Sequence, residues 1–441
     1  MAKYSKYNII SQIRNSANYF IVNLLSGNAD ILDKEEAEKI LSIKNGGSAD
    51  DEFIEELTAK GYLTDEKEEK KKFLQKYLSF LDSRESDEVQ LFFITNYSCN
   101  FACSYCYQDQ YTNAYNELTK EVIDSFYNHI RTEFAGRKKY VTIFGGEPLL
   151  PGSKQKDNIS YLLEKAASNG LRVCIVTNGY TLKEYSSMFS PELIREIQVT
   201  LDGTKEMHDS RRYLKGGGAT FDKIVEGIDS CLEKGLPVNL RIVADRENIG
   251  NIPELASFAI EKGWTANPLF KTQIGRNYEL HHCQSSSGKL FDRISLYEKL
   301  SEITKSNPHV LQFHKPAYSI TRYLAENGNL PEPLFDSCPA CKTEWAYDYT
   351  GRIYPCTATV GKEGENLGTY FPEHRLNESN AEEWSSRDVT TIKECTECNL
   401  QLACGGGCGS VARNHSGKIC SPDCRPVKEL MELGFSAYLG Q

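Results

Sequence analysis

The strongest signal in the chain is Thr95-Asn96-Tyr97-Ser98-Cys99-Asn100-Phe101-Ala102-Cys103-Ser104-Tyr105-Cys106, which follows the apolar run Leu91-Phe92-Phe93-Ile94. The run predicts a short buried strand, so the three cysteines lie on a loop that leaves a strand. Thiolates separated by three and then two residues can hold one face of a four-iron cube and leave its fourth iron without a protein ligand. Zinc is the alternative, but a structural zinc site normally has a fourth ligand, and none lies next to this loop.

Alternating strand and helix patterns continue from this loop to about residue 275. Apolar runs predict buried strands at 91–94, 141–144, 173–176, 197–201 and 238–243. Amphipathic patterns predict helices at 119–134, 159–169, 221–234 and 252–262, and glycine follows the last three, as a left-handed C-cap requires. Such β-α repeats predict a parallel sheet covered by helices, as a barrel or partial barrel. Chemistry on this scaffold is expected at the C-terminal ends of the strands.

Composition excludes several classes of function. Lys and Arg number 51 against 61 Asp and Glu, and a net charge of -10 argues against nucleic acid as a partner. No stretch approaches the about 20 apolar residues of a membrane-spanning helix, and the N-terminus lacks the apolar core of a secretory signal. We therefore expect a cytoplasmic chain that contacts no membrane. Because that compartment is reducing, the 15 cysteines predict metal or redox chemistry rather than disulfides.

Further motifs stand at the ends of the next three predicted strands. They are Gly145-Gly146-Glu147-Pro148, Thr177-Asn178-Gly179 and Thr200-Leu201-Asp202-Gly203. With the cysteine loop, these motifs resemble the radical S-adenosylmethionine (SAM) superfamily over about residues 88–275. The resemblance implies an α/β fold class with a partial (β/α)6 barrel. It also implies a [4Fe-4S] cluster on Cys99, Cys103 and Cys106, whose open iron is chelated by SAM. Reductive cleavage of SAM then gives a 5'-deoxyadenosyl radical that abstracts hydrogen.

The same resemblance implies a set of SAM-binding residues. Gly145, Gly146 and the Glu147 carboxylate are expected at the methionine amino group, where glycine lets a ligand approach the backbone. Relatives contact the ribose at the strand end that holds Thr200 and Asp202, and most have Ser in place of Thr200. Segments 208–212 and 218–221 also resemble family motifs and make Arg212 the candidate for the SAM carboxylate or the substrate, and the one candidate catalytic residue. Tyr105 and Asn178 complete the set.

From about residue 336 the chain is rich in cysteine and glycine, without the periodicity of a large core, so we expect metal binding to hold it. The cysteine spacing resembles the SPASM domain, which implies two auxiliary [4Fe-4S] clusters. One takes Cys338, Cys341, Cys356 and Cys408, and the other Cys395, Cys398, Cys404 and Cys424. Either Cys338 or Cys341 can be spare, which would leave an open auxiliary iron, and Cys420 is the alternative to Cys424. A zinc ribbon on Cys395, Cys398, Cys404 and Cys408 is the rival site.

The remaining cysteines carry simpler expectations. Cys174 in a strand and Cys231 on a helix are expected to be buried small hydrophobes. Cys283 follows His281 and His282, and a surface segment is favoured there over a metal site.

Residues 1–88 predict a separate module, and residues 276–335 a bridge to the cysteine-rich segment. Apolar residues around Ser26–Asp30 predict a hairpin, Asp33 can cap a first helix, and residues 53–63 give a second helical face. This pattern resembles the winged-helix element that recognises precursor peptides in maturases of ribosomally made peptides. In that element a leader peptide adds a strand to a sheet edge.

Together these features predict a radical SAM/SPASM maturase of a ribosomally made precursor peptide, related to sactisynthase, ranthipeptide and cyclophane maturases. Its product is an intramolecular crosslink, with a thioether favoured and a carbon–carbon or carbon–oxygen bond possible. Expected partners are the leader-bearing precursor peptide and a reductant such as flavodoxin or ferredoxin. An anaerobic sulfatase-maturating enzyme that forms formylglycine is the alternative enzyme. From another class, the alternative is a non-catalytic leader-binding or electron-transfer iron–sulfur protein, but the intact cysteine loop and the Gly145–Pro148 motif argue strongly against it.

Overall fold

The computed structural model describes residues 3–106, 117–277 and 288–439. Its main sheet has ten strands, in the order β11-β10-β9-β8-β7-β6-β12-β13-β14-β15. The six parallel strands of the predicted barrel are β6 (Val89–Ile94), β7 (Lys139–Phe144), β8 (Val173–Thr177), β9 (Ile194–Thr200), β10 (Val238–Ala244) and β11 (Phe270–Arg276). They neighbour one another in chain order, which confirms the partial barrel. Of these strands, β11 is the one that the sequence pattern did not predict.

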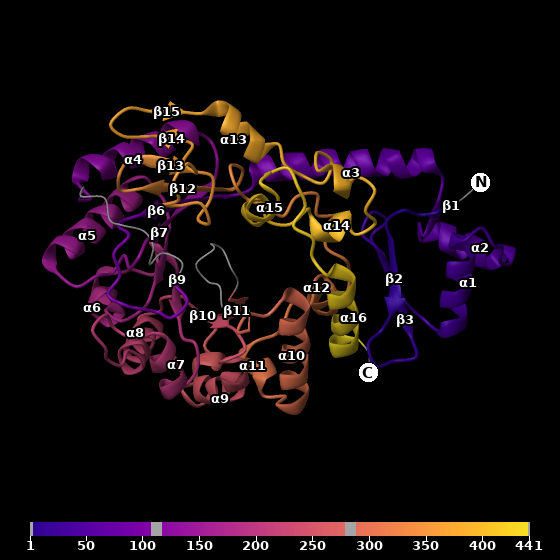
Figure 1. The fold of residues 1–441 in the computed structure, drawn as a ribbon, viewed down its shortest axis with the longest axis horizontal. Helices are drawn as coiled ribbons and strands as arrows, with labels where there is room; N and C mark the ends of the chain where they lie inside the picture. The colour runs from indigo at the N-terminus through magenta and orange to yellow at the C-terminus, as the bar shows by residue number, and fades with distance from the viewer. Residues whose placement is uncertain (1–2, 107–116, 278–287, 440–441) are drawn as a thin grey trace.

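Helices lie on the outer side of this curved sheet (Figure 1). The four predicted helices are α4 (Lys120–Glu133), α5 (Ser153–Ser168), α8 (Phe221–Glu233) and α9 (Ile252–Glu261). Shorter elements complete the layer: α6 (Leu182–Tyr185), η2 (Ser186–Met188), α7 (Lys205–Arg211), η3 (Ile249–Asn251) and η4 (Trp264–Ala266). Gly170, Gly235 and Gly263 have φ of 66°, 71° and 71°, so the predicted left-handed ends are confirmed.

Each barrel strand is apolar on the face that meets the helices. In β10, Val238, Leu240 and Ile242 are buried in the core, whereas the alternate residues Asn239 and Arg241 face the barrel interior. Successive side chains of a strand point to opposite faces, so this alternation gives β10 one apolar face and one face with polar side chains. Other strands add Phe92, Phe144 and Val176 to the lining, so the interior is a cavity of mixed polarity, unlike the apolar layers that fill a complete barrel.

The cysteine-rich segment continues the barrel sheet. Its strand β12 (Glu344–Asp348) pairs in parallel with β6, and three short antiparallel strands follow: β13 (Arg352–Tyr354), β14 (Gly368–Thr369) and β15 (Arg375–Leu376). The ring of Tyr347 is buried and lies 5.3 Å from Phe126 of α4. The expectation that apolar burial does not hold this segment is therefore wrong, because it shares the barrel's apolar core.

Helical elements complete the C-terminal half. The bridge contains α10 (Arg293–Ser306), α11 (Val310–Phe313) and α12 (Thr321–Asn327), and the cysteine-rich segment contains α13 (Glu378–Ser385), η5 (Lys393–Cys395), α14 (Gln401–Cys404), α15 (Gly409–Ser416) and α16 (Val427–Tyr438). Arg293 of α10 forms a 2.7 Å ion pair with Asp423, which joins the bridge to the cysteine-rich segment. Within the described ranges, no helix has the length and apolarity to cross a bilayer.

The N-terminal module contains an antiparallel sheet of β2 (Asn8–Gln12), β3 (Tyr19–Asn23) and β4 (Asn28–Leu32), as the hairpin pattern predicted. A two-stranded ladder joins β1 (Lys3–Tyr4) to β5 (Leu63–Thr64), and the helices are α1 (Lys34–Lys44), α2 (Asp51–Ala59) and α3 (Glu66–Ser86). The Asp33 side chain caps α1 as expected. The face of this sheet that carries Phe20 packs against α16. There Phe20 stacks on Phe435 with ring centroids 4.5 Å apart.

Candidate active site

A cavity of about 920 Å³ occupies the barrel interior and its C-terminal mouth. The residues around it come from the cysteine loop, the ends of β7 to β9, the interior faces of the strands, and Thr357 and Ala358 after Cys356. The expected SAM and cluster residues that line it are Cys99, Cys103, Tyr105, Cys106, Gly145, Gly146, Glu147, Asn178, Thr200 and Arg212. Asp202 is fully buried behind this wall. The structure therefore brings together residues that are more than 100 positions apart in the sequence.

The cysteine loop is held by backbone contacts on both sides. Ala102 N–H donates to the Tyr213 carbonyl at 2.9 Å, and Ser104 N–H to the Arg211 carbonyl at 3.1 Å. The Cys99 sulfur accepts hydrogen bonds from Phe101 N–H at 3.3 Å and from the Asn178 amide at 3.7 Å. Burial raises the pKa of the Cys99 thiol to about 12, so its thiolate needs a compensating positive charge. An iron–sulfur cluster supplies that charge, so these donors fit it.

Gly145 and Gly146 allow the loop after β7 to pack directly on the cysteine loop. Gly145 has φ 152°, and a Cβ there would lie 2.5 Å from the Asn96 carbonyl oxygen. A Cβ on Gly146 would overlap the Ser98 carbonyl. The Gly146 and Glu147 amides donate to these same two carbonyls, at 2.9 and 2.8 Å. The close packing of these two protein segments therefore requires glycine at both positions, and the expected approach of the methionine amino group to this backbone stays a prediction.

The Glu147 carboxylate joins the ends of β7 and β8. It accepts hydrogen bonds from the backbone N–H of Leu149 at 2.8 Å, the Thr177 hydroxyl at 2.7 Å and the backbone N–H of Asn178 at 2.6 Å. Burial raises its pKa to about 6, and these three donors limit the rise. The carboxylate is thus part of the framework of the site, in addition to any contact with a ligand.

Tyr105, Asp202, Arg211 and Arg212 form one buried polar network. The Tyr105 hydroxyl donates to Asp202 at 2.6 Å and accepts from Arg212 at 2.7 Å. Arg211 pairs with Asp202 at 3.3 Å and, through both terminal nitrogens, with Asp245 at 2.9 Å. Asp202 therefore positions Tyr105 and Arg211, and it is not at the cavity surface.

Arg212 is the expected residue that has unused hydrogen-bonding capacity. Its side chain is buried, and its Nε has no hydrogen-bond partner among the residues described. An orphaned guanidinium donor facing a cavity fits an anionic ligand such as a carboxylate. His208, next to this network, is fully buried: its Nδ1 accepts from Asp202 N–H at 3.2 Å. Burial lowers the pKa of His208 well below its ordinary value, so the ring is neutral.

The C-terminal cysteines lie in two sets of neighbouring thiols. Burial raises the pKa of Cys356 most, and the nearby Cys338 and Cys408 raise it further. Burial is also the main cause of the raised pKa of Cys341, and the nearby Cys338 raises it further. In the second set, burial raises the pKa of Cys395 to about 11, with added contributions from Cys404, Cys398 and Cys424. Cys420 is exposed, and its thiol donates to the Thr391 carbonyl at 3.4 Å.

Arg387 lies between these two thiol sets and is fully buried. Its guanidinium donates to the carbonyls of Ile419, Gly407, Gly406 and Ser421 at 2.6–2.9 Å. This side chain ties together the segments on which the two cysteine sets stand. The backbone near the sets is also tight, because a Cβ on Gly405 would lie 2.7 Å from Ser337 N.

Across the described ranges, no group of three or more His, Cys, Asp or Glu side chains is close enough to hold one metal ion. The auxiliary iron–sulfur clusters and the rival zinc ribbon both stay predictions.

The other cysteines differ in part from expectation. Cys231 is buried, as predicted. Cys174 is only half-buried and lines the barrel cavity, so its description as a buried core residue is wrong. It faces inward because β8 alternates, with Val173 and Ile175 turned to the core. Cys283, His281 and His282 lie outside the described residues.

Several cavity residues were missed from the sequence, and they share one position in the strands. They are the polar alternates that face the interior: Gln90, Thr142, Gln198, Asn239, Arg241 and Lys271. The signal that could have found them is the alternation itself, as in Val-Asn-Leu-Arg-Ile-Val at 238–243.

Comparison with known proteins agrees with this geometry. The model of the radical SAM superfamily matches residues 93–259. The chain is 29% identical over 160 residues to the Fe-coproporphyrin III synthase of Methanosarcina barkeri, a match of 36% of this chain and 37% of that protein. It is 28% identical over 212 residues to a GTP 3',8-cyclase of Rhizobium etli, covering 46% of this chain and 54% of that protein. The chain thus spans about a third to a half of these two curated relatives.

Longer matches include the C-terminal half. The cysteine-type anaerobic sulfatase-maturating enzyme of Clostridium perfringens is 21% identical over 358 residues, which are 76% of this chain and 93% of that protein. The structure of anSMEcpe with bound AdoMet and Cp18Cys peptide has a TM-score of 0.61 at 18% identity, over 80% of this chain and 98% of that one. Streptococcus suis SuiB bound to precursor peptide SuiA has a TM-score of 0.54 at 15% identity, over 97% and 99%. At these identities the structural likenesses show the fold.

Proposed function

Residues 93–259 of this chain are a radical SAM domain, and from this premise we propose that the protein is a SAM-dependent maturase that crosslinks a ribosomally made peptide. The carrying observation is a single cavity that joins the cysteine loop, the SAM-binding motifs and the barrel interior. When bound, SAM and a reduced four-iron cluster on Cys99, Cys103 and Cys106 supply a 5'-deoxyadenosyl radical for hydrogen abstraction.

The chain's own residues position SAM. Arg212 binds its carboxylate, since its Nε is buried without a partner, and Tyr105 holds the guanidinium in place at 2.7 Å. The backbone at Gly145 and Gly146, on the rim of the cavity, approaches the amino group, with Glu147 adding negative charge. Thr200 at the end of β9 offers its hydroxyl to the ribose, and Asn178 closes the cavity beside Cys99. Two auxiliary clusters on the C-terminal sets complete the cofactors.

A thioether is the favoured product. One C–H bond and one S–H bond of the peptide break and a C–S bond forms. One hydrogen atom leaves on the 5'-deoxyadenosyl fragment, one proton leaves the thiol, and one electron returns to an iron–sulfur acceptor. An auxiliary cluster held by the Cys356 set would be suited to accept it, because Thr357 and Ala358 directly after Cys356 line the cavity. Carbon–carbon and carbon–oxygen bonds obey the same balance, and a flavodoxin or ferredoxin is the proposed reductant.

The open edge of the N-terminal sheet is the proposed leader-binding site. Among the described strands, β4 has a neighbour on one side only. The other edge strand, β2, is covered, because Asn399 donates to the Asn8 carbonyl at 3.2 Å and Ser11 to Glu432 at 2.5 Å. Ile31 on β4 is 46% exposed. An extended peptide can add to such an edge through its backbone.

Formylglycine formation on a sulfatase is the second candidate, and the long match to the cysteine-type enzyme of Clostridium perfringens favours it. The N-terminal module instead favours a leader-bearing peptide as the substrate. SuiB, whose structural likeness extends over 97% of this chain, has been solved with a precursor peptide. The two candidates differ in the fate of the substrate sulfur, which a thioether retains and formylglycine made from cysteine loses.

The test uses the anaerobic holoenzyme with SAM, dithionite and a short Cys-rich peptide chosen by reading the open frames adjacent to its gene. We expect a product that has lost two hydrogens, keeps its sulfur and has one thiol that iodoacetamide no longer alkylates. Ile31→Glu should weaken peptide binding and leave uncoupled SAM cleavage unchanged. Leu311→Glu, at another exposed apolar side chain, is the matched control. Loss of sulfur would support the sulfatase candidate, and absence of SAM cleavage would reject both.

Point variants are preferable to deletion of residues 1–88. Phe20 and Val22 share one apolar cluster with Val389, Ile392 and Met431. Deletion would expose that cluster and disturb the cysteine-rich segment, so a loss of activity would not report on peptide recognition.

A further inference from the structure

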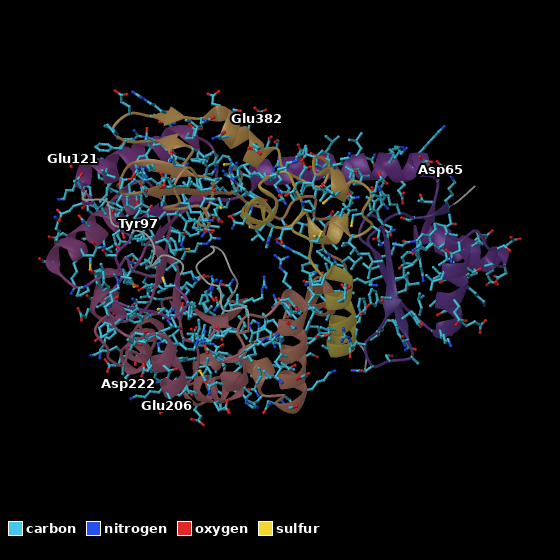
Figure 2. The ribbon with its side chains drawn as sticks, viewed as in Figure 1. Asp65, Tyr97, Glu121, Glu206, Asp222 and Glu382 are labelled. Carbon is cyan, nitrogen blue, oxygen red and sulfur yellow. The ribbon has the colours of Figure 1, made fainter. Side chains whose placement is uncertain are left out.

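The barrel cavity concentrates positive charge in a chain whose net charge is -10. Its lining includes the five cations Arg195, Arg212, Arg241, Lys271 and Arg276, against the two carboxylates Glu147 and Glu196. Figure 2 shows the acidic residues Glu121, Glu206, Asp222 and Glu382 at the outer boundary of the molecule. A cavity of this sign attracts anionic groups.

Most of these cations already have an acceptor. Arg195 pairs with Glu88 and lies 4.1 Å from the ring centroid of Tyr140. Lys271 pairs with Glu196. The Arg276 guanidinium donates to the Phe291 carbonyl at 2.6 Å. Arg212 belongs to the proposed SAM site. These side chains therefore offer little for a further ligand.

Arg241 differs from the others. It is half-buried on β10 and lines the cavity, and its guanidinium has no hydrogen bond or ion pair to any described residue, although its backbone carbonyl accepts from Leu201 N–H at 3.0 Å. Its guanidinium lies over Gly275 of β11, where a Cβ would be 3.4 Å from Nη2, so glycine leaves room for it. A partly desolvated cation without a counterion costs stability. A purely structural arginine would have an acceptor within the protein.

The position of Arg241 places it at the level of the proposed SAM site. Its Cα is the register partner of Thr200 on the neighbouring strand β9. Thr200 stands at the end of its strand, where the proposed function puts the SAM ribose. A group bound by Arg241 would therefore lie beside the reacting end of the cofactor, where the substrate must enter.

A second orphaned group lies two residues away on the same face of β10. Asn239 is 8% exposed, and its Oδ1 has no hydrogen-bond partner among the described residues, while its Nδ2 donates to Glu196 at 2.9 Å. Residues i and i+2 of a strand point the same way, so this acceptor and the Arg241 donors share the cavity. Their ligand offers both a carboxylate and an N–H donor, as an acidic residue within a peptide does.

We propose that Arg241 forms a carboxylate-binding subsite, and that the substrate peptide carries Asp or Glu beside the residue that is modified. This proposal rests on the proposed function, because it names the substrate class of the same cavity. Arg241 acts here as a specificity residue: its planar guanidinium binds a carboxylate through two parallel hydrogen bonds.

The test is a binding selection, so its result does not depend on turnover. A random library of linear peptides, displayed on their own mRNA, is equilibrated anaerobically with immobilised, SAM-loaded holoenzyme, and recovered sequences are counted. The variants are Arg241→Gln, Arg241→Glu and Arg241→Lys, with Arg195→Gln as the matched control that removes an already paired cavity cation. Since the N-terminal module is the same in all of them, its own preferences cancel when variants are compared.

We expect the wild type to enrich peptides with Asp or Glu, and Arg241→Gln to lower that enrichment about tenfold, the effect of losing one charge-assisted contact. Arg241→Glu should favour Lys and Arg instead, Arg241→Lys should keep part of the acidic preference, and Arg195→Gln should keep all of it. Iron content and SAM affinity, measured on each variant, should equal those of the wild type. If Arg241→Gln loses iron, the enrichment of acidic peptides by Arg241→Lys is compared with that of the wild type instead, and the expected partial loss tests the subsite.

Two results would overturn the subsite. Peptides recovered without acidic bias by the wild type, or with the same bias by Arg241→Gln, would reject it and leave the peptide maturase standing. Recovery of no peptide above a support without protein would reject peptide binding itself, and the subsite with it.

Discussion

The Tyr105 hydroxyl donates a 2.6 Å hydrogen bond to Asp202 and receives one of 2.7 Å from Arg212. One phenol thus connects the cysteine loop to the end of β9 and to the C-terminal end of α7. Burial raises the pKa of Tyr105 well above its ordinary value, so the hydroxyl keeps the proton that it donates. Arg212, which we propose to bind the SAM carboxylate, depends on this phenol for its position.

Tyr105→Phe should weaken SAM binding by about 10- to 100-fold, because hydrogen bonds to a charged group are worth about 1.5–3 kcal/mol. The ring stays, so the loop keeps its packing, but Arg212 loses the acceptor that orients it. Equilibrium binding of SAM to the anaerobic protein measures the effect. Tyr140→Phe, at a tyrosine that lines the cavity on β7, is the control and should bind SAM as the wild type does. Equal affinity of both variants would contradict the positioning role.

Cys424→Ala should remove the iron of one cluster, about four atoms per chain, whereas Cys420→Ala should remove none. Both cysteines are exposed, but Cys424 lies near Cys395, Cys398 and Cys404, whereas the Cys420 thiol donates to the Thr391 carbonyl. The two cysteines are close in sequence, so the pair separates ligation from general damage. Iron analysis after anaerobic reconstitution gives the answer. Iron loss in Cys420→Ala alone would reverse the assignment of the last ligand.

The strands and helices of the barrel could be predicted because each is specified locally. Val173 and Ile175 mark one buried face, and Gly170 and Gly235 end helices in a conformation that favours glycine. The motif residues could also be placed, since the ends of successive parallel strands meet at one edge. The separate role of each motif residue could not be predicted. That Glu147 would join two strand ends depends on donors from Thr177 and Asn178, which are 30 residues away or more.

Contacts between distant segments were beyond the sequence pattern. Nothing local to residues 344–348 indicates that they pair with β6, because five residues fit many sheets equally well. The stacking of Phe20 on Phe435 is similar, since each is an ordinary apolar residue in its own element. Arg241 was missed because a single arginine in a strand reads as a surface residue until its neighbours show that the strand lines a cavity.

Arg387→Met should destabilise the cysteine-rich segment by at least about 3 kcal/mol, because it leaves four buried carbonyls without donors at about 1–3 kcal/mol each, not fully additive. Methionine keeps the volume and loses the donors to Gly406, Gly407, Ile419 and Ser421. Arg387→Lys should recover part of the loss, since an ammonium has three donors. Urea unfolding of both variants measures this. A wild-type midpoint in Arg387→Met would show that these bonds contribute nothing net.

His314 should make stability fall between pH 6.5 and pH 4. Burial lowers the pKa of His314 from 6.5 to about 4, Arg322 adds to the shift, and Thr272 opposes it. A base whose folded pKa lies below its unfolded pKa stabilises the folded state fully above the unfolded value. That contribution is lost as pH falls toward the folded pKa, because the unfolded chain binds a proton that the folded chain does not bind. The largest possible loss is about 3 kcal/mol, at 1.36 kcal/mol per pKa unit.

His314→Asn isolates this titration, because asparagine keeps a polar group near Thr272, whose hydroxyl lies 3.1 Å from the His314 Nδ1, and carries no charge at any of these pH values. Urea unfolding at pH 7.5, 6 and 5 should show the wild type losing more free energy of unfolding than the variant, with a growing difference below pH 6.5. The carboxylates and His129, which is also buried with a pKa lowered to about 4, titrate in both proteins and cancel in the comparison. Parallel pH profiles would mean that the pKa of His314 is the same in the folded and unfolded chains, and that the barrel does not exclude charge at the end of α11.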